Sequence, residues 1–137
     1  MKKREPVSKI MTSDVITLNH TDNLDTAEQL FKKNNIRHIP VVSGTSIIGM
    51  LSLTDLLRIS FADAAQGGDV DTTVYNMFTI EQVMAKNIVS IGSDATIKEA
   101  AEILSQKEFH ALPVVDNGEL AGIVTTTDMI NYLLDQY

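Results

Sequence analysis

Residues 36–55 read IRHIPVVSGTSIIGMLSLTD, and residues 109–128 read FHALPVVDNGELAGIVTTTD. Each stretch holds two short runs rich in β-branched residues with a polar turn between them, a pattern that predicts a β-hairpin. Asn117 and Gly118 form the turn of the second stretch, and both tolerate positive φ. Gly44 stands in the corresponding, weaker turn of the first stretch. The same hairpin is therefore predicted twice in one chain.

The similarity extends beyond the hairpins to an internal repeat. Residues 7–60 align with residues 80–133 without a gap, at a constant offset of 73 positions. A gapless match of this length indicates one supersecondary unit that occurs twice. Because a unit of roughly 50 residues would be marginally stable alone, we expect the two to pack together around a pseudo-twofold axis. Identical pairs include Met11 and Met84, Pro40 and Pro113, Gly49 and Gly122, and Asp55 and Asp128.

Each repeat is predicted to fold as β-α-β-β-α. Runs rich in β-branched residues at 15–18 and 88–91 predict the first strands. Asn23 is the expected N-cap of the first helix, and Thr96 with Glu99 fits a capping box for the equivalent helix of the second repeat. The predicted class is therefore α/β (α+β).

The repeats also define the domain boundaries that we expect. Repeat 1 covers residues 1–62 and repeat 2 covers residues 80–137. Residues 63–79 between them are small and polar in part, which is typical of a mobile linker.

Composition narrows the function classes. The chain has 137 residues, of which 44% are hydrophobic and 21% charged, so it can bury a core. Its net charge of -7 argues against a nonspecific nucleic-acid binder. The absence of cysteine excludes disulfides, thiolate metal sites and cysteine nucleophiles. No apolar run approaches the roughly 18 residues that cross a bilayer, and no signal peptide is recognised, so a cytoplasmic location and no membrane partner are expected.

A polar motif follows the last strand of each repeat. It has a glycine, two apolar residues, and then Ser/Thr-x-Thr-Asp, at residues 49–55 and 122–128. In one interpretation Thr54 and Thr127 cap the helices that follow. In the other, the same hydroxyls and free N–H groups suit a phosphate. The carboxylates would then accept hydrogen bonds from a ribose diol, and the recurrence of the motif favours this ligand interpretation.

These motifs resemble those of the cystathionine-β-synthase (CBS) domain family, whose tandem pairs are called Bateman modules. The resemblance rests on the apolar-Pro-Val-Val strands at 39–42 and 112–115 together with the two Ser/Thr-x-Thr-Asp motifs, and it covers residues 7–134. It implies that the two β-α-β-β-α repeats pack through their sheets around the pseudo-twofold axis. It also implies two clefts that bind adenosine-containing ligands, with AMP, ADP, ATP and S-adenosylmethionine as candidates. It also implies a regulatory role toward a separate, unidentified effector protein, with no required cofactor.

The resemblance implies that each cleft combines residues of both repeats, with apolar side chains around adenine and cationic ones near phosphates. The first cleft would contain Ile16, Ile36, Arg37, His38, Thr125, Thr127 and Asp128. The second would contain Val89, Phe109, His110, Ala111, Ser52, Thr54 and Asp55.

Structural roles are the alternative for many of these residues. The apolar members are equally compatible with plain core positions, and Arg37 with a surface salt bridge. The histidines are more often structural than phosphate ligands, and His20 is expected to be solvated. The clefts also differ, since Ala111 stands where the first repeat has His38. We therefore expect the first cleft to favour phosphorylated ligands more strongly.

Three function classes remain to be compared. An enzyme is disfavoured because the sequence contains no dinucleotide-binding GxGxxG motif, no P-loop GxxxxGK[ST] motif and no metalloprotease HExxH motif. We therefore assign no catalytic residue and no metal ligand. A nucleotide-sensing regulatory protein is the leading interpretation, and a ligand-free dimerisation scaffold is its alternative. The apolar pairs Leu56-Leu57 and Met129-Ile130 lie on the last predicted helix of each repeat. Exposed apolar faces of this kind are usually buried against a partner, which predicts a homodimer.

Overall fold

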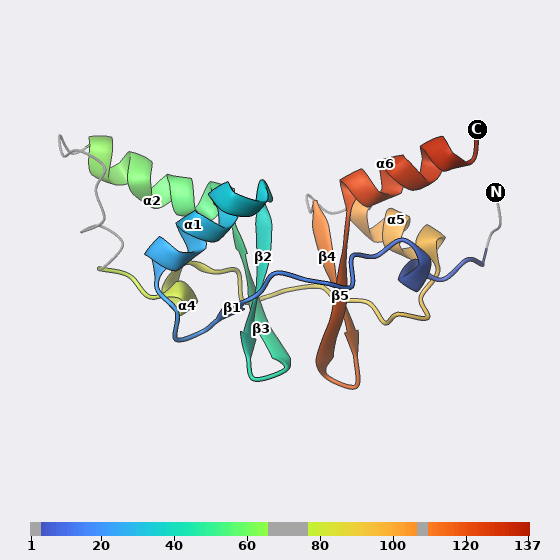
Figure 1. Ribbon diagram of the computed structural model, residues 1–137, viewed down its shortest axis with the longest axis horizontal. Coiled ribbons are helices and arrows are strands. Elements are labelled where there is room, and N and C mark those ends of the chain that lie inside the picture. The colour runs from blue at the N-terminus through green and yellow to red at the C-terminus, as the bar shows by residue number, and fades with distance from the viewer. Residues whose placement is uncertain (1–3, 66–76, 107–109) are drawn as a thin grey trace. The chain divides into compact units, whose positions relative to one another are not determined.

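The computed structural model describes residues 4–65, 77–106 and 110–137 (Figure 1). The chain forms two compact units. The first-repeat unit comprises residues 16–88, and the second-repeat unit comprises the residues up to 15 together with 89–137. Most of the predicted linker at 63–79 lies outside the described residues. Among the described residues, no helix is both long and apolar enough to span a membrane.

The first-repeat unit contains a three-stranded sheet and its helices (Figure 1). The short strand β1 pairs in parallel with β2, and β2 pairs antiparallel with β3. Gly44 forms the turn between β2 and β3 at a φ of +65°, as the sequence predicts. The elements are β1 (Leu18–Asn19), α1 (Leu24–Asn34), β2 (His38–Ser43), β3 (Ser46–Ser52), α2 (Leu53–Ala65) and α4 (Ile80–Val83).

The second-repeat unit repeats this arrangement. Strands β4 and β5 form an antiparallel hairpin whose turn residues Asn117 and Gly118 have φ values of 54° and 81°. Ile91 pairs in parallel with Val114, at the place that β1 takes in the other unit. The elements are the 3-10 helix η1 (Val7–Lys9), α5 (Ile97–Gln106), β4 (Ala111–Asp116), β5 (Glu119–Thr125) and α6 (Thr126–Asp135).

The helix starts and faces follow the sequence pattern. Asn23 accepts a hydrogen bond from the Thr26 N–H at 2.9 Å and so caps α1. Thr96 and Glu99 form the predicted reciprocal capping box ahead of α5. The apolar faces of both helices pack into the core of their own unit. The buried helix residues are Leu24, Ala27 and Phe31 in α1, and Ile97, Ala100 and Leu104 in α5.

The predicted first strands are wrong in length. Residues 15–18 and 88–91 were both expected to be strands, whereas β1 covers Leu18–Asn19 and the second repeat has a single bridge at Ile91. The ladder beside β1 involves Val41 and Val42 of β2. A β-branched run shows that a segment suits a pleated, half-buried surface, but the strand extends as far as its ladder of hydrogen-bonded partners.

Each unit is completed by a segment from the start of the other repeat. In the first-repeat unit, Met50 and Ala85 exchange two backbone hydrogen bonds of 3.0 and 2.9 Å. Thr12 and Ile123 do the same in the second-repeat unit, at 2.8 and 3.0 Å. The compact units therefore differ from the sequence repeats. Residues 79–85, around the start of repeat 2, lie in the first-repeat unit, and residues 6–12, near the start of repeat 1, lie in the second-repeat unit.

Two repeated glycines allow this close approach. A Cβ atom on Gly49 would lie 2.9 Å from the Ala85 carbonyl oxygen and 2.4 Å from the Met84 sulfur. A Cβ atom on Gly122 would lie 2.8 Å from the Thr12 carbonyl oxygen and from the Met11 sulfur. Both contacts are too short for any side chain, which gives the matching Met and Gly positions of the repeat a structural reason.

Candidate functional site

The two Ser/Thr-x-Thr-Asp motifs lie at the junctions from β3 to α2 and from β5 to α6. The Asp55 N–H donates to Ser52 Oγ at 3.0 Å. Thr125 forms a full capping box, because its Oγ1 accepts from the Asp128 N–H at 3.1 Å and its own N–H donates to Asp128 Oδ2 at 2.9 Å. The first residue of each motif thus accepts from its aspartate N–H.

The capping assignment made from the sequence is wrong by two residues. Thr54 and Thr127 were expected to cap, but α2 and α6 begin at Leu53 and Thr126. The reason is that each helix starts directly after its strand, which makes the aspartate the third helical residue. Both threonines are exposed. Their hydroxyls therefore belong to the first turn of each helix, where a ligand can reach them.

The residues before each Pro-Val-Val strand lie beside the motif of the same repeat. The Leu53 N–H donates to the Arg37 carbonyl at 2.8 Å, and His38 pairs with Ser52 across the hairpin. In the second-repeat unit, the Thr126 N–H donates to the His110 carbonyl at 3.0 Å, and Ala111 pairs with Thr125. In each unit, the described residues just before the Pro-Val-Val strand, which belong to one predicted cleft, therefore lie beside the motif, which belongs to the other. Phe109 lies outside the described residues.

The apolar candidates are partly structural. Ile16, Ile36 and Val89 are half-buried, and Ala111 is buried. Ile36 packs against the core of the first-repeat unit and Val89 against that of the second. These side chains therefore contribute to the cores of their units, but each also keeps some surface in contact with solvent.

The electrostatic surroundings of the two carboxylates differ. Arg58 Nη1 lies 3.5 Å from Asp55 Oδ1, whereas Asp128 Oδ2 accepts from the Thr125 backbone. Arg37 is exposed beside the first motif. The sequence reasoning missed Arg58, although its spacing of three residues from Asp55 on a predicted helix was a usable signal. Within the described part of the chain, no three His, Asp or Glu side chains are grouped as a metal site would require.

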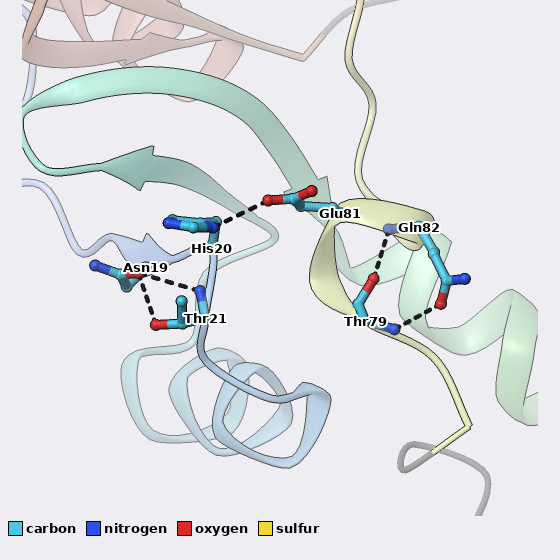
Figure 2. A network of polar contacts seen from close by, with 6 residues as sticks. All are labelled: Asn19, His20, Thr21, Thr79, Glu81 and Gln82. Carbon is cyan, nitrogen blue, oxygen red and sulfur yellow. Dashed lines mark hydrogen bonds and ion pairs between the residues drawn. The ribbon is translucent and has the colours of Figure 1, made fainter.

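His20 was expected to be solvated; its side chain is partly exposed, and it also contacts a residue of the other repeat that the sequence did not indicate. Its Nδ1 atom lies 3.0 Å from Glu81 Oε1 of α4, and its side chain is 34% exposed (Figure 2). Glu81 follows Thr79, which caps α4 together with Gln82 (Figure 2). Sixty-one positions separate the two partners, so local sequence patterns carried no signal for this contact.

Comparison with known proteins identifies the class that this repeated fold and motif define. The CBS domain family matches residues 7–62 and 80–135, which together make up most of the chain. The protein belongs to the CBS domain family and contains a CBS domain pair.

Several relatives and a solved structure are similar to this chain. The chain is 32% identical over 123 residues to the CBS domain-containing protein YhcV of Bacillus subtilis, covering 90% of this chain and 81% of that protein. It is 31% identical over 138 residues to protein MJ1404 of Methanocaldococcus jannaschii, of which it spans 33% while 97% of this chain is matched. The crystallised CBS domain pair of protein MJ0100, in complex with 5′-methylthioadenosine and S-adenosyl-L-methionine, is 25% identical with a TM-score of 0.79. That match covers 96% of this chain and 98% of the MJ0100 chain.

Proposed function

We propose that this protein is a regulatory, non-catalytic CBS pair that binds an adenosine-containing ligand and acts on a separate effector protein. The observation that carries the proposal is the repeated aspartate at the start of α2 and α6, Asp55 and Asp128, beside an exposed threonine in each case. The MJ0100 pair, which shares the fold, was crystallised with two adenosine derivatives.

The chemistry of the motif suits a nucleoside. An ionised carboxylate is a pure acceptor and can take both hydrogens of a ribose diol. Half-buried apolar side chains such as Ile16, Ile36 and Val89 suit the faces of adenine. Arg37 suits phosphate, because a guanidinium can bind it bidentately. AMP, ADP, ATP and S-adenosylmethionine therefore remain the candidate ligands.

We assign the two clefts as the family resemblance implies, with residues 16 and 36–38 acting together with the second-repeat motif. Double variants test this pairing. Arg37→Ala combined with Asp128→Asn should impair one cleft and leave the other intact. Arg37→Ala combined with Asp55→Asn should impair both clefts. The opposite result would place Arg37 with Asp55 and contradict the assignment.

A thermal-shift panel of AMP, ADP, ATP, NAD, S-adenosylmethionine and a cyclic dinucleotide tests the proposed function. A ligand at 100 times its dissociation constant should stabilise the chain by about 2.7 kcal/mol, which is easily measured. Failure of all six to stabilise the chain would instead support the ligand-free scaffold.

Exposed apolar residues support the proposed homodimer. Leu57 on α2 and Ile130, Leu133 and Leu134 on α6 are 42%, 57%, 44% and 64% exposed. The sequence had also placed Leu56 and Met129 on these open faces, which is wrong, since Leu56 is buried and Met129 packs against the core of its unit. Light scattering should give about twice the 15.0 kDa of one chain, and a monomer at tens of micromolar would contradict the dimer.

A further inference from the structure

A guanidinium accompanies the motif carboxylate of the first repeat. Arg58 lies one turn after Asp55 on α2, with Nη1 3.5 Å from Asp55 Oδ1. The equivalent position on α6 is Asn131, which is uncharged. Asp128 instead directs Oδ2 to the Thr125 N–H at 2.9 Å. The repeated motif thus carries a cation in one repeat and a neutral side chain in the other.

The Asp55–Arg58 contact explains little of the stability of the fold. Its distance of 3.5 Å is at the long limit of a hydrogen bond, and the Arg58 side chain is 75% exposed. Exposed ion pairs of this kind contribute little to folding. An arginine has five N–H donors, and this contact uses one terminal nitrogen. Arg58 is therefore available to bind a ligand at the surface where Asp55 lies.

We propose that Arg58 binds the phosphate of the nucleotide whose ribose is held by Asp55, an inference that rests on the proposed function. The sequence assigned one cation, His110, to the second cleft. Arg58 adds a permanent positive charge there, and it offsets the repulsion between the Asp55 carboxylate and a phosphate. Arg37 then serves phosphates in the first cleft and Arg58 in the second. This revises the expectation that the first cleft favours phosphorylated ligands more strongly.

Calorimetric titration of three proteins with adenosine, AMP and ATP tests Arg58 directly. Arg58→Asn introduces the residue that the second repeat carries. Lys98→Asn is the matched control, because Lys98 is also an exposed helix cation, 3.7 Å from Glu102 one turn away. Arg58→Asn should weaken AMP and ATP binding at one cleft by about tenfold, the effect expected for a hydrogen bond to a charged group. Adenosine binding should be unchanged, and Lys98→Asn should match the wild type for all three ligands.

The outcomes separate this inference from the proposed function. Equal weakening of adenosine and AMP by Arg58→Asn would show that the arginine supports the site without touching phosphate. Unchanged AMP binding in a wild type that binds AMP would likewise overturn the role of Arg58 and leave the proposed function standing. A wild type that binds none of the three ligands would overturn both. Asp55→Asn provides the reference, since it should weaken adenosine and AMP alike.

Discussion

The two units share a backbone plan but differ in the polar contacts that connect its parts. In the first-repeat unit, the loop after β1 contacts α4 through His20 and Glu81. The equivalent loop of the second-repeat unit is held to the end of β4, where the Ser93 N–H donates to Asp116 Oδ1 at 3.0 Å. Both units therefore have this loop at the equivalent place in the sequence, but different residues hold it in each unit.

A second pair of equivalent positions shows the same divergence. In the second-repeat unit, the Tyr132 hydroxyl donates to Glu5, and this hydrogen bond raises the pKa of Tyr132. The corresponding positions of the first repeat are Ile59 and Phe78, both apolar. Conversely, the glycines beneath Met84 and Met11 are the same in both units. Close backbone approach thus constrains both repeats, whereas the polar contacts differ between them.

The largest expected effect concerns the shared glycines. Gly49→Ala and Gly122→Ala should each destabilise the protein by about 1–3 kcal/mol, because the new Cβ meets a backbone oxygen that cannot move aside cheaply. Gly92→Ala is the matched control, since its Cβ would first meet a flexible aspartate side chain at 3.0 Å. Urea unfolding measures all three. If only one of Gly49→Ala and Gly122→Ala lowered the free energy of unfolding, the two units would not be equivalent at these glycines.

The motif aspartates should differ in their effect on stability. Asp128→Ala removes one half of a capping box and should lower the free energy of unfolding by about 1 kcal/mol. Asp55→Ala should cost less, because its carboxylate makes a long contact of 3.5 Å with the exposed Arg58 instead of a capping bond. Asp128→Asn keeps an acceptor for the Thr125 N–H and should recover most of the loss. Equal losses for both alanine variants in thermal unfolding would contradict this difference.

The His20–Glu81 contact should contribute less than the caps. His20→Ala should lower stability by less than about 1 kcal/mol, because both side chains are partly exposed. Glu81→Gln is the companion variant, since it keeps the shape of the side chain and removes its charge. If loss of this contact causes the lower stability of His20→Ala, the double variant should be no less stable than His20→Ala alone. Fully additive losses in chemical unfolding would show that the two residues do not interact.

The smallest effect is expected for Asp116, and it should fade in acid. Hydrogen bonds from the Ser93 side chain and backbone lower the pKa of Asp116 below its ordinary value. A lowered pKa stabilises the fold above the unfolded-state pKa, and the contribution is lost as the pH falls through the folded-state value. In urea unfolding, Ser93→Ala should therefore be slightly less stable than the wild type at pH 7, and the difference should shrink as the pH falls into the acid range. Ser90→Ala, at an exposed neighbouring position, should match the wild type at every pH, and a Ser93→Ala loss that is the same at all pH values would contradict the role of Asp116.

Local sequence patterns predicted what depends on neighbouring residues. The Asn117-Gly118 turn, the Asn23 cap and the Thr96 capping box are all decided within four positions, and the structure contains them. The pairing of Met50 with Ala85 and the His20–Glu81 contact depend on how distant segments pack, so they could not be read from local patterns. The residues of the candidate site also fall into those that local patterns predicted and those that they did not. The repeated aspartates were found from the motif, whereas the capping partner of Asp128 depended on where the helix begins.

Calorimetric titration with AMP of the wild type, Asp55→Asn and Asp128→Asn tests the central claim most directly. The wild type should bind up to two ligands per chain, one for each motif. Each single variant should weaken one class of site by about 10- to 100-fold, which corresponds to the loss of a hydrogen bond to a charged group. Both variants should remain folded, as judged by circular dichroism. Binding that is unchanged in stoichiometry and affinity in both variants would contradict the assignment of the ribose to these aspartates.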